Sequence, residues 1–87
     1  MGARLYLVMA MRRPDFPADV VQPHREFLAE LRARNQLQLT GGFSDGRGGA
    51  YVLCNVDSLA DAQAIVARDP LVLRGASTLT VHEWNVH

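Results

Sequence analysis

Residues 36–56, QLQLTGGFSDGRGGAYVLCNV, decide the fold. Residues 36–40 alternate strictly between polar and apolar side chains, which is typical of a half-buried strand. Residues 50–56 form a second apolar run, and the glycines between the two runs end one strand and return the chain to the other. The segment therefore predicts a β-hairpin with an extended, glycine-rich loop.

A helix is predicted before the hairpin, over residues 21–34. Pro23 fits its first turn, where the missing N–H costs nothing. Asn35 fits its carboxyl-terminal cap, since asparagine tolerates left-handed backbone better than most residues. His24 lies three, four and seven positions before large apolar side chains of the same helical stripe: Phe27, Leu28 and Leu31. An imidazole that faces the core in this way must be satisfied by a partner.

A second helix is predicted after the hairpin. Ser58 and Asp61 form a variant of the capping box, in which Asp replaces the usual Glu. The helix runs to about Arg68, because the residue before a proline avoids the helical region and Asp69 precedes Pro70. Residues 71–75 are expected to form a connector.

The outermost segments are both predicted to be strands. Residues 5–11 are rich in large apolar side chains and residues 78–86 in β-branched ones. The order β-α-β-β-α-β predicts an α+β fold: a ferredoxin-like sandwich whose four-stranded antiparallel sheet carries two helices on one face. The other face would be bare, which predicts a homodimer. Candidates for that face are Tyr51, Leu53, Trp84 and Val86.

Length and composition narrow the function classes. The 87 residues predict one domain, 1–87, with a small core. A net charge of zero without a basic stripe argues against nucleic acid as a partner. The apolar run 5–11 is too short to cross a membrane. Cys54 is the single cysteine and is expected to be an inert core thiol, which favours a cytoplasmic location.

The ordered set of these features resembles the YCII-related (YciI-like) family. The resemblance is carried along nearly the whole chain by Pro23-His24, by Phe27-Leu28 and Leu31, by Gly41-Gly42-Phe43-Ser44-Asp45, by Asp69-Pro70 and by Trp84. It implies a dimeric α+β barrel in which two sheets pack face to face. It also implies a His–Asp pair in a cleft, suspected to be catalytic, which falls on His24 and Asp45. A related enzyme group dehydrochlorinates a chlorinated hydroxymuconate.

These residues fit proton transfer. His24 would be the general acid/base, because an imidazole titrates near neutral pH, and Asp45 would orient its ring. Ser44 or the Gly46 N–H would bind a substrate carboxylate or a developing enolate. The structural alternative is a His24–Asp45 hydrogen bond that only pins the hairpin to the helix.

Arg25 and Asp69 have two interpretations each. Arg25 is either a solvated charge or an anchor for an anionic substrate at the rim of the cleft. Asp69 is either a helix stop that accepts local backbone hydrogen bonds or a second carboxylate of the cleft.

The sequence thus predicts a lyase or isomerase that acts on a small carboxylate without a cofactor or a metal ion. One alternative is a non-catalytic dimer that binds a small ligand or serves as an accessory subunit. A further alternative is a cofactor-free monooxygenase of the same barrel architecture, for which Trp84 and Asn85 are the only hint.

Overall fold

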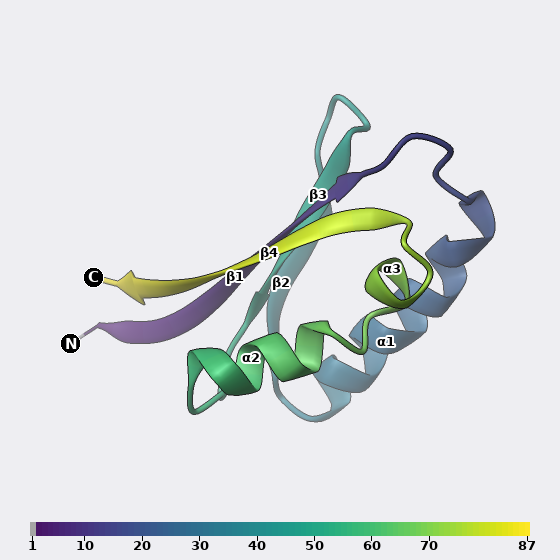
Figure 1. Cartoon of the computed structure of the whole chain (residues 1–87). Helices are drawn as coiled ribbons and strands as arrows, with labels where there is room; N and C mark the ends of the chain where they lie inside the picture. The colour runs from purple at the N-terminus through teal and green to yellow at the C-terminus, as the bar shows by residue number, and fades with distance from the viewer. Residues whose placement is uncertain (1) are drawn as a thin grey trace.

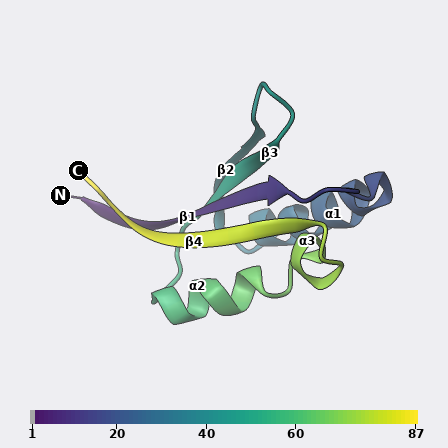
Figure 2. The ribbon, with the colours of Figure 1, turned by 45° about the horizontal axis from the view of Figure 1, so that its top comes forward.

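A computed structural model describes residues 2–87, and its strands form one antiparallel sheet in the order β2-β3-β1-β4. The helices lie together on one side of this sheet (Figures 1 and 2). The predicted ferredoxin-like α+β fold is therefore confirmed. The elements are β1 (Ala3–Arg12), η1 (Ala18–Val20), α1 (Val21–Ala33), β2 (Leu37–Gly42), β3 (Gly48–Leu53), α2 (Leu59–Val66), α3 (Pro70–Leu73) and β4 (Ser77–Val86).

The segment expected to be a connector begins with a short helix instead. Asp69 has an extended backbone, and its side chain accepts a hydrogen bond from the Leu71 N–H, so it caps α3. Pro70 follows at the first helical position, where its fixed φ angle suits a helix. Asp69, which was expected to stop the second helix, instead follows the end of α2 at Val66 by three residues and starts α3. At the end of α1, Asn35 has a φ of 60°, as expected of a residue that follows a helix.

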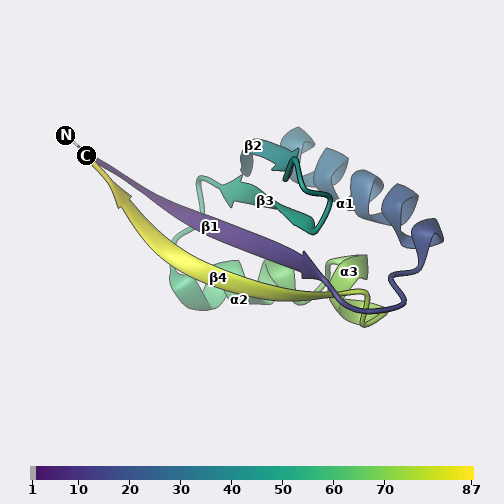
Figure 3. The same ribbon diagram turned by 90° about the horizontal axis from the view of Figure 1, so that it is seen from above.

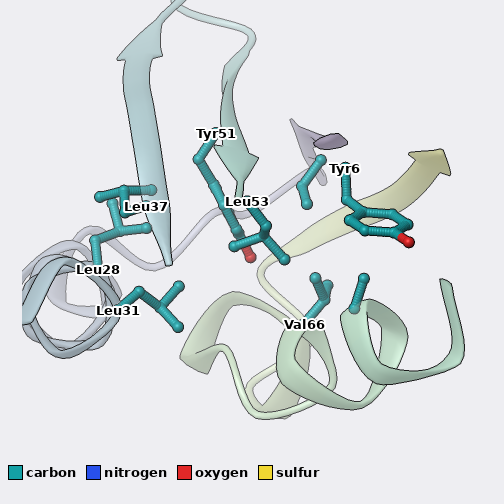
Figure 4. Packing of buried hydrophobic residues seen from close by; sticks show 9 residues of the cluster. Tyr6, Leu28, Leu31, Leu37, Tyr51, Leu53 and Val66 are labelled. Atoms are coloured by element: carbon teal, nitrogen blue, oxygen red, sulfur yellow. The ribbon is translucent and has the colours of Figure 1, made fainter. Parts of the chain in front are cut away.

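The core lies between the sheet and the helices. In the β1–β3 register Tyr6 is opposite Leu53 and Val8 is opposite Tyr51, so these four side chains share one face of the sheet. All four are buried against helical residues that include Leu28, Leu31 and Val66 (Figure 4). The expectation that Tyr51 and Leu53 lie on the bare face is thus wrong, because alternation places them on the helix side.

The opposite face of the sheet has no helix over it. Leu7 is opposite Val52 on one side and His82 on the other, and Leu5 is opposite Trp84. Leu39 and Trp84 expose 59% and 46% of their surface. The register places Trp84 and Val86 on this face, as predicted. This face therefore carries apolar side chains from β1, β2 and β3 and a solvent-exposed tryptophan on β4.

The first and last strands project beyond the helices as a two-stranded ribbon. Ala3 pairs with Val86, so both ends of the described chain lie at the same corner of the sheet (Figure 3). The β2–β3 turn extends from the opposite end (Figure 2). Among residues 2–87, no helix has the length and apolar character needed to span a bilayer.

Candidate functional site

His24 and Asp69 form a hydrogen-bonded pair between the first turn of α1 and the start of α3. His24 Nδ1 lies 2.9 Å from Asp69 Oδ1. The Asp69 side chain is completely buried, and that of His24 is 19% exposed. A buried carboxylate needs several donors, and the paired imidazole supplies one of them.

Two further donors complete the environment of Asp69. The Leu71 N–H donates to Oδ1 at 2.8 Å, and the Tyr51 hydroxyl donates to Oδ2 at 2.8 Å. An ionised carboxylate accepts hydrogen bonds at both oxygens and donates none, so this set of three donors suits the charged form. The residue is thus held by its own helix, by α1 and by β3 at the same time.

Tyr51 is locked in the donor role. Burial raises the pKa of the Tyr51 phenol far above its ordinary value, and the negative charge of Asp69 and the hydrogen bond to it raise it further. The hydroxyl therefore keeps its proton over the working pH range. The ring also packs near His24, with centroids 5.9 Å apart, and Figure 4 shows the side chain running from β3 toward the helices.

The Asp69 carboxylate fixes the tautomer of His24. Because the carboxylate is only an acceptor, Nδ1 of the neutral imidazole must carry the proton. The lone pair is then on Nε2, which has no hydrogen-bond partner among residues 2–87. This arrangement leaves one basic nitrogen free to meet a ligand, and the carboxylate stabilises the imidazolium that proton uptake produces.

His24 lines a cavity of about 350 Å³ between α1 and the hairpin end of the sheet. Its apolar walls come from β1, α1, α3 and the loop after β1: Ala10, Phe16, Val21, Leu28 and Leu71. Polar groups reach it from several elements: Arg12, His24, Arg25, Thr40, Tyr51 and Ser77. A mostly apolar hollow with a few polar groups is the usual form of a small-molecule site.

Glycines leave room for the cavity because they place no side chains on its sheet side. Gly42 is opposite Gly49. Gly42 comes two residues after Thr40 and Gly49 two residues before Tyr51, so both glycines are on the helix side of the sheet. A Cβ at Gly49 would collide with the Gly41 carbonyl oxygen, so that position demands glycine. A Cβ at Gly42 would meet only the Gly48 carbonyl oxygen, at 3.8 Å. The floor of the cavity is thus bare backbone.

Asp45 is not the partner of His24. It lies in the exposed turn between β2 and β3, where its Oδ1 accepts the Arg47 N–H at 2.9 Å and its Oδ2 lies 3.9 Å from Arg47 Nε. The predicted His24–Asp45 pair is therefore wrong. The physical reason is that Asp45 satisfies its own turn, while Asp69 is carried under α1 by the α2–α3 junction.

Of the other predicted site residues, some lie at the cavity and some lie in the exposed turn. Arg25 lines the cavity next to His24, whereas Ser44 and Gly46 are exposed in the turn and do not line it. Asp69 accepts the local backbone hydrogen bond that was expected of it, and it also supports the site from behind His24.

Three residues of the site were missed in the sequence: Arg12, Phe16 and Tyr51. Tyr51 had a usable signal, because in a strand whose alternate residues face the helices a tyrosine needs a polar partner for its hydroxyl. Arg12 and Phe16 follow the first strand in an irregular segment, and nothing in their spacing indicates a shared cavity. Trp84 does not line the cavity; it is opposite Leu5, whereas the β1 residues of the cavity are Ala10 and Arg12.

Comparisons with known proteins agree with this architecture. The family model of the YCII-related domain matches residues 5–85. The chain is 46% identical over 81 residues to the uncharacterized protein YjpA of Bacillus subtilis (strain 168), covering 93% of this chain and 94% of YjpA.

Two solved structures share the fold. The 5-chloro-2-hydroxyhydroquinone dehydrochlorinase TftG of Burkholderia phenoliruptrix AC1100, in complex with 2,5-dihydroxybenzoquinone, has a TM-score of 0.69 and 21% identity over 92% of each chain. The C-terminal domain of the Mycobacterium tuberculosis MgtC protein has a TM-score of 0.58 and 20% identity, over 95% of this chain and 89% of that one.

Proposed function

Because the chain belongs to the YCII-related family, we propose that it is a proton-transfer enzyme of the lyase or isomerase type. The observation that carries the proposal is the 2.9 Å contact of His24 Nδ1 with buried Asp69, which leaves Nε2 free at the wall of a cavity. A base held in one tautomer by a buried carboxylate is suited to general acid/base catalysis.

The proposed reaction starts with His24. Its Nε2 removes a proton from a C–H or O–H group conjugated with a carbonyl, and Asp69 stabilises the imidazolium. The released electron pair forms a new double bond. If the substrate carries a leaving group such as chloride, the group departs as an anion and His24 passes its proton to solvent. Without a leaving group, His24 returns the proton to another carbon, and the product is an isomer.

The dehydrochlorinase TftG supports this choice of chemistry, since it shares the fold and its name describes loss of hydrogen chloride from a small ring. For this chain we propose a small carboxylate-bearing or enolic substrate, which the cavity volume of about 350 Å³ accommodates. Arg25 lines the cavity beside His24 and adds a positive charge that favours an anionic substrate.

The proposal is tested with wild type, His24→Gln and a matched control, His87→Gln, which replaces an exposed histidine that follows β4. Chloride release from 5-chloro-2-hydroxyhydroquinone and from small chlorinated carboxylates is measured, together with hydrogen–deuterium exchange of the substrates in D₂O by NMR. We expect His24→Gln to lose about 100-fold or more in turnover, and His87→Gln to match wild type.

A different outcome would favour the binding-module alternative. If no substrate of the panel exchanges or eliminates, while small carboxylates still bind wild type and His24→Gln with equal affinity, the cavity holds a ligand without transferring a proton. Turnover that survives His24→Gln would exclude the proposed role of this residue.

We also propose that the bare sheet face forms a homodimer. Support comes from exposed Leu39 and Trp84 and from the paired ends of β1 and β4, which project beyond the helices. A two-stranded ribbon is marginal in water unless something packs on it. Trp84 is the single tryptophan, so dilution should shift its emission to longer wavelength as the dimer dissociates. Light scattering that gives a monomer mass at micromolar concentration would contradict the dimer.

We further propose that the protein is located in the cytoplasm. It is supported by Cys54, the single cysteine of the chain, which carries a free thiol as suits a reducing compartment.

A further inference from the structure

Arg12 stands at the end of β1 with its side chain stacked on an aromatic ring. Its guanidinium carbon lies 4.2 Å from the centroid of the Phe16 ring, and both residues line the cavity. A guanidinium over a ring face is attracted by the ring quadrupole. The stack therefore restricts the orientation of a long side chain that is otherwise exposed.

The donors of Arg12 are unused. Within residues 2–87 its side chain makes no hydrogen bond and no ion pair. Arginine N–H groups point outward in the guanidinium plane, so stacking on Phe16 leaves the whole edge available. A guanidinium group that is already held in place loses less conformational entropy on binding a carboxylate than a freely moving one does.

Within the described part of the chain, the cavity lining has positively charged side chains but no negatively charged ones. Arg12 and Arg25 both line it, and no Asp or Glu side chain among residues 2–87 does. The one carboxylate nearby, Asp69, is completely buried behind His24 and is satisfied by three donors. An anion that enters the cavity therefore meets two cationic side chains and no competing negative charge on the described lining.

The shape of the cavity favours flat ligands, in addition to the preference of its charges for anions. Its floor is the backbone of Gly42, Gly48 and Gly49, and Phe16 and Leu28 contribute apolar walls. Glycine backbone without side chains presents a surface that a flat ring or a conjugated chain can approach closely.

We propose that Arg12, positioned by Phe16, selects planar anionic ligands by binding their carboxylate or enolate oxygen. The inference rests on the proposed function, because it adds the substrate class of the same site and leaves the proton transfer to His24. Arg12 is the specificity residue in this scheme, and Arg25 contributes charge from α1.

The test compares benzoate with benzamide, which has nearly the same shape but no charge. Dissociation constants are measured by NMR titration for wild type, Arg12→Gln and Arg13→Gln, the last being an adjacent exposed arginine outside the cavity lining. We expect wild type to prefer benzoate and to lose this preference with added salt. Arg12→Gln should weaken benzoate about tenfold and leave benzamide unchanged, because a charge-assisted hydrogen bond is lost. Arg13→Gln should behave as wild type.

A second variant tests the stack itself. Phe16→Leu keeps an apolar wall but removes the ring, so benzoate should weaken about two- to threefold. The inference is overturned if benzoate and benzamide bind wild type alike, if neither binds, or if Arg12→Gln binds benzoate as tightly as wild type. None of these results depends on turnover, so each is distinct from a failure of the His24→Gln experiment.

Discussion

The α2–α3 junction and the β2–β3 turn contain the same local motif in opposite environments. Asp69 accepts the N–H of Leu71 at 2.8 Å, and Asp45 accepts the N–H of Arg47 at 2.9 Å, so each carboxylate bonds the backbone two residues on. The Asp69 side chain is fully buried and that of Asp45 is 60% exposed. The comparison teaches that a turn motif places an aspartate locally, while packing against distant elements decides whether it gains a chemical partner.

The largest expected effect comes from breaking the buried member of the pair. Asp69→Ala leaves the Tyr51 hydroxyl and the Leu71 N–H without their acceptor inside the core and removes the cap of α3. We expect the free energy of unfolding to fall by about 3 kcal/mol. Urea denaturation followed by circular dichroism measures it. A loss no larger than that of Asp45→Ala would contradict the comparison.

A smaller effect is expected at Tyr51. Tyr51→Phe keeps the ring but leaves Asp69 Oδ2 without its donor, which should cost about 1–2 kcal/mol near neutral pH. The raised pKa of Tyr51 adds a pH dependence. Above about pH 10 an unfolded tyrosine loses its proton while the folded one keeps it. The native state then holds more protons, so the free energy of unfolding of wild type falls as the pH rises.

The Tyr51→Phe variant has no phenolic proton at this position, so the stability gap between it and wild type should narrow as the pH rises from about 9 to about 11. The chain contains no lysine, so no lysine ammonium group titrates in this alkaline range and obscures the effect of Tyr51 on stability. A gap that stays constant over this range would show that Tyr51 ionises equally in both states.

The smallest effect is expected at the exposed member. Asp45→Ala removes one turn hydrogen bond and a long, solvent-exposed contact with Arg47. The free energy of unfolding should change by no more than about 0.5 kcal/mol, and turnover should stay at the wild-type level. Loss of turnover in a folded Asp45→Ala protein would return Asp45 to the site.

The sequence was sufficient for the fold but not for the pairing within the site. Alternation in residues 36–40 and the proline after Asp69 are local signals, and they predicted the hairpin and, to within two residues, the end of α2. The partner of His24 depends on how far α2 carries Asp69 beneath α1, which no local pattern encodes. Two aspartates in turn contexts were therefore equivalent in the sequence, and the resemblance to a family favoured the wrong one.

The cavity was missed for a related reason. The glycines of residues 41–49 predicted a turn, which is their local effect. Their second effect is the lack of side chains on the helix side of β2 and β3, and it appears only when the register places Gly42 opposite Gly49 beside His24.

The glycine floor of the cavity limits the size of a ligand, whereas His24 would act on its reactive group, so these two properties depend on different residues. Gly42 contacts none of the groups that hold His24, and its Cβ direction is almost open. Replacing it by alanine or valine would shorten the space by the depth of one or two methyl groups while the base and its carboxylate stay in place. A change at this one residue would thus restrict the cavity to smaller ligands without altering the His24–Asp69 pair.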